Sequence, residues 1–185
     1  ENKTRCAWCE KDDLYRNYHD NEWGKPVYDD ETIFEFLILE TFQAGLSWYT
    51  VLAKRENFRK AFDNFNLKKI ANYSEDKMAE LAEDAGIIRN KLKIKATVTN
   101  AQAFIKVQEE FGTFSKYIWG FVDGKPIDNK PKTLKDVNAT TEISDLLSKD
   151  LKKRGFKFVG STVVYAHMQA TGMVNDHVED CWVRG

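Results

Sequence analysis

The chain has 185 residues and a net charge of −1, with 42% hydrophobic and 31% charged residues, as in an ordinary soluble globular protein. No uncharged apolar run reaches 18 residues, which excludes a membrane-spanning helix, and the near-neutral total gives no global sign of nucleic-acid binding. The polar N-terminus lacks the apolar core of a signal peptide. We therefore expect one cytoplasmic domain over residues 1–185, without a membrane partner.

The first predicted helix follows an irregular N-terminal segment and begins near Glu31. Asp29 and Asp30 stand just before it as candidate N-caps. Apolar residues at positions 33, 34 and 36–39 leave no clean polar face, which predicts a helix surrounded by others. Glu40 then lies in or beside the core, where a carboxylate is costly unless it is paired, hydrogen-bonded or functional.

The segment after this helix looks like one wall of a pocket. Gly45 breaks the helix, and Ser47 is a plausible N-cap for the next one, predicted over residues 47–62. Glu40, the glycine break and the rings of Trp48 and Tyr49 lie within ten residues of one another. The alternative is a core helix whose Glu40 pairs with a distant Arg or Lys.

The remaining sequence predicts further helices and no clear strand, hence an all-α fold. In chain order they are a short helix capped by Ser74 and ended by Gly86, a long helix over 89–111 ended by Gly112, an aromatic helix or turn over 114–122, and a helix from Thr141 or Ser144 to Arg154. The polar stretch before Thr141 is the loosest part. Residues 160–170 suit a strand or a helix, and we predict a helix capped by Ser161.

Three cysteines and three histidines are potential metal ligands, and all but His167 lie near the chain ends. His177 and Cys181 are four residues apart and would share one face of a helix. Cys6 and His19 would complete a Cys2His2 tetrahedron suited to zinc, although Cys9 offers a rival first pair with Cys6. So few cysteines in a cytosolic protein argue against a disulfide framework. The alternative is ordinary buried cysteines.

Two stripes of positive charge stand out against the near-neutral total. Residues 89–95 carry four positive charges, and residues 149–157 carry five against one acid. The first stripe follows a tight glycine turn, as in a helix-hairpin-helix, where backbone N–H groups at a helix N-terminus hold a phosphate. Glycine turns are common between helices, however, and solvated helix faces are the more common cause of a lysine run.

Several aromatic residues would surround the buried acid: Trp8, Tyr15, Tyr18, Trp23, Trp48 and Tyr49. Aromatic residues near an N-terminus usually belong to the core. Clustered around a carboxylate, they would instead sandwich a flat or cationic ligand.

Six strings spread over nearly the whole chain together resemble the bacterial DNA-3-methyladenine glycosylase I family. They are YHDNEWG at 18–24, QAGLSW at 43–48, KREN at 54–57, DAGIIR at 84–89, KKRGFKFVG at 152–160 and VNDH at 174–177. The resemblance implies an all-helical helix-hairpin-helix fold of two closely joined lobes, with the hairpin at about 75–111. It also implies a structural zinc that ties the two termini together.

Carried over position by position, the resemblance assigns roles to particular residues. Zinc would be held by Cys6, His19, His177 and Cys181. Cys9 does not belong to the family pattern and leaves open a register in which it replaces a ligand. The base pocket would use Glu40 as its catalytic residue, with the rings of Tyr18, Trp48, Trp8, Tyr15 and Trp23. The remaining DNA contacts would come from Gln43, Gly45 and Leu46, inserted into the gap left by the flipped nucleotide, and from Gly86, Arg89 and Lys91.

The implied reaction is hydrolysis of the N-glycosidic bond of N3-methyladenine in alkylated double-stranded DNA, by a monomer that releases 3-methyladenine. N3-methylation gives the base a positive charge, so it leaves as a neutral molecule without being protonated. Water is the expected nucleophile, because no lysine lies within residues 34–52 to form a Schiff base. Two other classes stay open. An inert zinc-stapled DNA-binding domain would not need Glu40, and a small-molecule-binding protein would not need the basic stripes.

Overall fold

The structure is a computed structural model that describes residues 3–43 and 45–184, and it is mostly helical. The α-helices are α1 (Asp13–Asn21), α2 (Asp30–Phe42), α3 (Trp48–Ala53), α4 (Arg55–Ala61), α5 (Leu67–Ala71), α6 (Glu75–Ala82), α7 (Lys91–Phe111), α8 (Phe114–Trp119), α9 (Glu142–Lys153) and α10 (Ser161–Ala170). Short 3-10 turns are η1 (Ala7–Cys9), η2 (Asp63–Phe65), η3 (Gly120–Val122), η4 (Leu134–Asp136) and η5 (Trp182–Arg184). None of the described helices is both long and apolar enough to cross a membrane.

The prediction of a helical protein is confirmed, with one small addition. Strands β1 (Ile127–Asp128) and β2 (Val174–Asn175) pair in parallel, Ile127 opposite Val174. Two residues are too few to produce an alternating pattern, so the sequence carried no signal for these strands. The stretch predicted to be the loosest thus contains β1 and η4.

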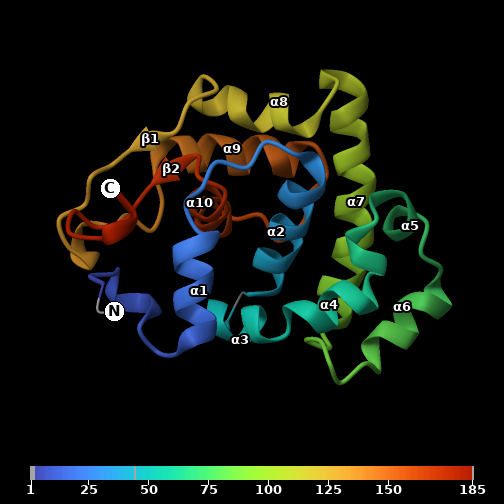
Figure 1. Ribbon diagram of the computed structural model, residues 1–185. Helices are drawn as coiled ribbons and strands as arrows, with labels where there is room; N and C mark the ends of the chain where they lie inside the picture. Colours follow the sequence, from blue (N-terminus) through green and yellow to red (C-terminus); the bar gives the residue numbers. More distant parts are fainter. Residues whose placement is uncertain (1–2, 44, 185) are drawn as a thin grey trace.

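Helix α2 lies at the centre of the molecule, with α7, α10, α3 and α8 around it (Figure 1). Asp29 caps it by accepting a hydrogen bond from the Thr32 backbone N–H at 2.9 Å, as its sequence position predicted. Every residue from Leu37 to Phe42 is buried, Glu40 included. A helix enclosed in this way needs no polar face, which explains the continuous apolar run.

Four predicted helix boundaries differ from the structure. Helix α6 ends at Ala82 rather than directly before Gly86. The helix expected over 47–62 breaks at Lys54 into α3 and α4. Helix α7 begins at Lys91, with Asn90 rather than Arg89 before it as the N-cap. The N-cap of α10 is Gly160, not Ser161, because the Ser161 hydroxyl bonds Asp145 at 2.6 Å instead of a backbone amide.

The buried apolar residues form two clusters. The larger is built on α2, α7 and α10, and the smaller contains Cys6, Tyr18, Trp23, Phe36, Leu52, Ala170 and Cys181. Trp48 packs against both. The two chain ends lie together on one side of the molecule (Figure 1), where the Trp182 backbone N–H donates to the Thr4 carbonyl at 2.8 Å. The smaller cluster therefore lies where the two ends of the chain meet.

Candidate functional site

A cavity of about 390 Å³ lies beside the C-terminal half of α2. Seven of the residues that the sequence assigned to a pocket or to DNA line it: Trp8, Tyr15, Tyr18, Trp23, Glu40, Gln43 and Trp48. Tyr49 does not line it, because its hydroxyl donates to Asp12 on the surface of α1. The cavity is mostly apolar, with a few polar groups converging on it, as ligand pockets usually are.

Glu40 is the buried carboxylate of this wall, and its partner is a histidine. Its Oε1 lies 2.7 Å from His167 Nδ1, and the two side chains are 2% and 1% exposed. The alternative read from the sequence was a pairing with Arg or Lys, and none is found among the residues that the structure describes. Burial raises the pKa of Glu40, and the interaction with His167 opposes that rise. Among the described residues only His167 donates to this carboxylate, and it does so at Oε1.

Tyr18 and Trp48 form adjoining walls rather than two parallel faces. Their ring centroids are 5.7 Å apart, with the planes inclined at 44°. A flat base between two parallel rings would need centroids about 7 Å apart, twice the ~3.5 Å contact distance. A base can therefore stack on one of these rings while the other meets its edge. Trp48 Nε1 is buried and finds no acceptor among the described residues.

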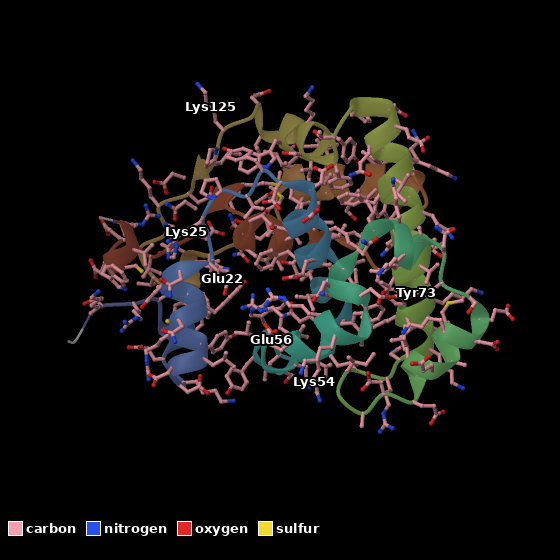
Figure 2. All side chains as sticks on the ribbon, turned by 45° about the vertical axis from the view of Figure 1, so that its right-hand side comes forward. Glu22, Lys25, Lys54, Glu56, Tyr73 and Lys125 are labelled. Atoms are coloured by element: carbon pink, nitrogen blue, oxygen red, sulfur yellow. The ribbon has the colours of Figure 1, made fainter. Side chains whose placement is uncertain are left out.

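The wall carrying Tyr18 is tied to the helices beneath it by an ion pair. Arg55 of α4 donates to both carboxylate oxygens of Glu22, just after α1, at 2.7 and 2.8 Å. Figure 2 shows Glu22 reaching from the end of α1 toward the segment that carries Lys54 and Glu56. This pair fixes the position of Tyr18 relative to α3 and its Trp48.

A second buried carboxylate, Asp176, also lines the cavity. It accepts hydrogen bonds from Asn129 at 2.7 Å and Gln169 at 2.9 Å, and from the hydroxyl of Tyr165. Three donors satisfy it, in contrast to Glu40. Its hydrogen bonds join β1 and β2 to α10 and hold that side of the cavity together.

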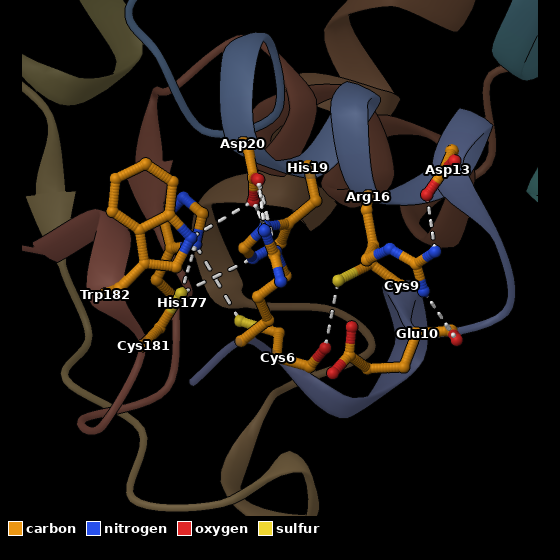
Figure 3. A network of polar contacts seen from close by, with 11 residues as sticks. Cys6, Cys9, Glu10, Asp13, Arg16, His19, Asp20, His177, Cys181 and Trp182 are labelled. Carbon is orange, nitrogen blue, oxygen red and sulfur yellow. Dashed lines mark hydrogen bonds and ion pairs between the residues drawn. The ribbon is translucent and has the colours of Figure 1, made fainter. Parts of the chain in front are cut away.

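Four buried residues from both chain ends meet beside the cavity: Cys6, His19, His177 and Cys181 (Figure 3). Cys181 Sγ lies 3.4 Å from His19 Nε2 and 3.6 Å from His177 Nδ1, and Cys6 Sγ lies 3.7 Å from His177 Nδ1. Tetrahedral zinc with sulfur at ~2.3 Å and nitrogen at ~2.1 Å requires ligand atoms ~3.4–3.8 Å apart. These three distances match a tetrahedral metal site, and all four donor atoms lie within 4.8 Å of one another.

Hydrogen bonds to the other ring nitrogens fix both tautomers in this cluster. His19 Nδ1–H donates to Asp20 at 2.8 Å, and Asp20 also accepts a bidentate ion pair from Arg5. His177 Nε2–H donates to the Trp23 carbonyl at 3.2 Å. Each histidine therefore turns a lone pair toward the cysteines, as a metal ligand must. The side chain of Cys6 above all, together with His177 and His19, holds the pKa of Cys181 well below its usual value.

The cluster forms without the helix that its spacing suggested. Residues 177–180 are not helical, and the chain brings His177 and Cys181 together through a turn. Gly24 makes room for them, because a Cβ there would lie 2.8 Å from His177 Nε2 and its φ is +82°. Cys9 lies outside the cluster, and its thiol donates to the Cys6 carbonyl at 3.2 Å.

Helices α6 and α7 follow each other in the part of the chain where the sequence predicted a hairpin, joined by residues 83–90. Within the described residues the backbone N–H groups of Ile88 and Arg89 have no acceptor, and the side chains of Arg89 and Lys91 are exposed. Lys93 does not belong to the exposed stripe, because it is buried and its ammonium donates to the Phe42 carbonyl at 3.2 Å. This bond joins α7 to the end of α2. The α6–α7 turn and the α2–α3 loop lie on the same side of the molecule (Figure 1).

Of the three residues expected in the gap of a flipped nucleotide, only Gln43 lines the cavity. Gly45 is exposed with φ +80°, and Leu46 is 42% exposed. The second basic stripe lies elsewhere, because the Lys157 backbone bonds Asn100 near the middle of α7. Asn100 is nine residues, or about 14 Å, from the start of that helix.

Sequence reasoning missed His167, Asp176 and the loop that covers the cavity with Leu134, Val137, Asn138 and Ala139. A histidine within an otherwise apolar helix was the available signal for His167. Its partner could not be found, because 127 residues separate it from Glu40. The loop carried no signal, since its sequence is typical of any polar connection.

Comparison with known proteins gives a consistent result. A model of the family described as methyladenine glycosylase matches residues 8–184. The chain is 49% identical over 177 residues to DNA-3-methyladenine glycosylase 1 of Escherichia coli (strain K12), covering 96% of this chain and 95% of that protein. It is 47% identical over 178 residues to DNA-3-methyladenine glycosylase of Haemophilus influenzae, covering 96% of each.

A solved structure shares the fold. It is 3-methyladenine DNA glycosylase I from Staphylococcus aureus, which was determined to show the structural basis of 3-methyladenine recognition. It superposes with a TM-score of 0.95 at 38% identity, covering 98% of this chain and 96% of that one.

Proposed function

The chain belongs to the methyladenine glycosylase family, and from that premise we propose that it hydrolyses the N-glycosidic bond of N3-methyladenine in alkylated DNA and releases the free base. The family resemblance drawn from the six sequence strings is confirmed. The observation that carries the proposal is the cavity wall, in which a buried carboxylate stands among aromatic rings. Among the described residues that line the cavity there is no Lys or Arg. Such a wall suits a flat, positively charged base.

Recognition begins with extrusion of the damaged nucleotide, because a base inside a duplex cannot reach the cavity, and a damaged base is the cheapest to extrude. Glu40 Oε2 then accepts a hydrogen bond from the exocyclic amine of the base, and its charge offsets the positive charge. One ring of the Tyr18–Trp48 pair stacks on the base while the other contacts its edge. Burial and the nearby Glu40 carboxylate keep the pKa of Tyr18 well above its usual value, so the phenol stays neutral.

Cleavage needs no proton donor for the leaving group, since the cationic base leaves as a neutral molecule. The bond between the base and the sugar breaks, and the electron pair goes to the base. Water supplies the hydroxyl that attaches to the sugar carbon, and its other proton goes to the solvent. The absence of Lys from the described cavity wall favours water over an amine nucleophile. Glu40 supports the positive charge that develops on the sugar.

For the metal we propose one zinc ion held by Cys6, His19, His177 and Cys181. The donor set and its spacing support this ligand set, and all four residues are buried, as in a closed structural site. Bound there, zinc would supply stability rather than chemistry, by joining the two ends of the chain. Cys9 makes its own bond to the Cys6 carbonyl and has no part in the set.

For the DNA surface we propose that α6, its turn and α7 form a helix-hairpin-helix that holds one phosphate. The unbonded amides of Ile88 and Arg89 and the exposed Arg89 and Lys91 support this role. Gly86 keeps the turn tight, because a Cβ there would lie 3.1 Å from Asp84 Oδ1 and 3.3 Å from Asn57. Gln43, Gly45 and Leu46 fill the gap that the extruded nucleotide leaves.

The test is release of base from methylated duplex DNA by the purified chain, with the products identified by chromatography and mass. We expect free 3-methyladenine and an abasic site, with no covalent trapping by borohydride, since no Schiff base forms. A chain that binds DNA but releases no base would be an inert adaptor. A chain that binds 3-methyladenine but neither binds nor cleaves DNA would be a small-molecule-binding protein.

A further inference from the structure

Behind the carboxylate of Glu40, seen from the cavity, lies the imidazole of His167. Glu40 lines the cavity and His167 does not, yet the two side chains are joined by a contact of 2.7 Å between Nδ1 and Oε1. They come from α2 and α10, two helices that pack against each other near the centre of the molecule (Figure 1). The proposed chemistry uses Glu40 and leaves the role of this histidine unexplained.

The other ring nitrogen shows where the proton belongs. His167 Nε2 is buried and has no partner among the described residues. A ring protonated at both nitrogens would bury a charged N–H without an acceptor, which is costly. An ionised carboxylate only accepts hydrogen bonds, so Nδ1 carries the proton toward Glu40. The favoured state is a neutral imidazole beside a carboxylate, with a net charge of −1.

We propose that His167 is a positioning residue for the reaction: its Nδ1–H holds Glu40 Oε1, so that Oε2 faces the cavity as an ionised acceptor for a cationic base. The inference rests on the proposed function and deepens it. Without this donor, burial would favour the protonated form of Glu40 over the ionised one. A protonated Glu40 would not offset the charge of the base, and its protonated oxygen would not accept a hydrogen bond from the amine of the base.

The pH dependence follows from the groups around Glu40. Burial raises its pKa and His167 lowers it, so the rate is full above the folded pKa and is lost as the pH falls through it. Removing the donor raises that pKa, and the acid side of the rate profile moves to higher pH. The neighbouring titratable groups are otherwise engaged: Lys93 of α7 donates to a backbone carbonyl, Asp176 accepts from three donors, and Tyr18 of α1 stays neutral.

Two substitutions separate the donor from the shape of the ring. His167→Phe keeps a flat ring and removes the Nδ1–H. His167→Asn keeps an N–H near the position of Nδ1 and lacks Nε2, which has no described partner to lose. Single-turnover release of 3-methyladenine is measured from pH 5 to 9 for both variants and the wild type, with thermal unfolding as a check on folding.

We expect His167→Asn to stay within about threefold of the wild type, and His167→Phe to lose about tenfold to a hundredfold near neutral pH, the range for a hydrogen bond to a charged group. The pH at which the rate of His167→Phe falls on the acid side of its profile should be higher than in the wild type. A folded His167→Phe with the wild-type rate and profile would overturn the proposal, as would a folded His167→Asn that fails equally. A wild type that releases no base would count instead against the proposed function.

A measurement on the unmodified protein keeps the proposal testable even if His167→Phe does not fold. Nitrogen-15 shifts of the histidine rings report which nitrogen is protonated, and His167→Asn identifies the signal. We expect a His167 ring protonated at Nδ1 and bare at Nε2 at neutral pH. A ring protonated at Nε2 and bare at Nδ1 would contradict the proposal, because it could not donate to Glu40.

Discussion

The Cys/His cluster and the cavity are neighbours that share two segments of the chain, and they differ in how completely their polar groups are satisfied. Tyr18 faces the cavity and His19 the cluster, and the same holds for Asp176 and His177. In the cluster each histidine nitrogen that points away from the cysteines has an acceptor, Asp20 or the Trp23 carbonyl. In the cavity region, Trp48 Nε1 and His167 Nε2 have no partner among the described residues.

This difference separates a structural role from a binding role. Buried polar groups are almost always hydrogen-bonded, and a fully satisfied network makes a region rigid. The cluster thus fixes the backbone at residues 18–19 and 176–177, and the cavity takes its shape from those residues. Polar groups without a described partner, such as Trp48 Nε1, are therefore confined to the cavity region. The predictions that follow break one region while sparing the other.

The largest effect is expected from removing a cluster residue. Cys181→Ser should lose the bound metal and lower the free energy of unfolding by about 3–5 kcal/mol, because loss of one ligand weakens the whole closed site. Elemental analysis and chemical denaturation measure the two quantities. Cys6→Ser should behave in the same way.

Cys9→Ser is the matched control for these variants. It alters a buried thiol three residues from Cys6 but removes no proposed ligand, so it should keep the metal and cost about 1 kcal/mol. Metal-replete wild-type protein that contains no zinc would exclude the site. If Cys9→Ser loses the metal and Cys6→Ser keeps it, Cys9 and not Cys6 is the ligand.

Substitution of a cavity residue should lower the rate of base excision and leave the metal content of the cluster unchanged. Trp48→Ala should slow single-turnover release of 3-methyladenine by roughly 5- to 150-fold, since base–aromatic stacking contributes about 1–3 kcal/mol per base. Its metal content should stay at one per chain. Trp48→Phe keeps the ring face and removes Nε1–H, so a near-normal rate assigns the effect to stacking. An equal loss in both variants would assign it to the indole N–H.

The smallest effect concerns the hairpin, which lies outside both regions. Lys91→Ala should flatten the slope of log K against log salt by about one unit for binding to duplex DNA. Lys106→Ala is the control, an exposed lysine of the same helix about 22 Å farther along. Equal slopes for the wild type and for substitutions at both Arg89 and Lys91 would move the phosphate contact elsewhere on the surface.

What the sequence predicted depended on the range over which each signal acts. The N-caps at Asp29, Ser47, Ser74 and Thr141 are all confirmed, because a cap is decided within four residues. The burial of Glu40 followed from its apolar neighbours. The meeting of Cys6 with Cys181 was a hypothesis drawn from the positions of the Cys and His residues, with Cys9 left as a rival, and the family resemblance then favoured Cys6.

Contacts between distant segments lay beyond sequence reasoning. The Glu40–His167 pair and the three donors to Asp176 join helices, strands and loops whose order in space is set by the whole fold. The split of residues 47–62 at Lys54 was missed for a related reason. Nothing in that lysine breaks a helix, and the chain turns there between Leu52 of the smaller cluster and Phe58 of the larger one.

The central claim is that the cavity selects its base by charge, through the carboxylate of Glu40. The direct test is single-turnover excision by Glu40→Gln, which keeps the shape and removes the charge. The substrates are cationic N3-methyladenine and the neutral analogue 3-deaza-3-methyladenine, at a pH where the analogue is uncharged. We predict a loss of about tenfold or more on the cationic lesion and a clearly smaller loss on the neutral one, each ~1.4 kcal/mol being tenfold in rate. Equal losses on both substrates would contradict the claim and leave the shape of the cavity as the source of selectivity.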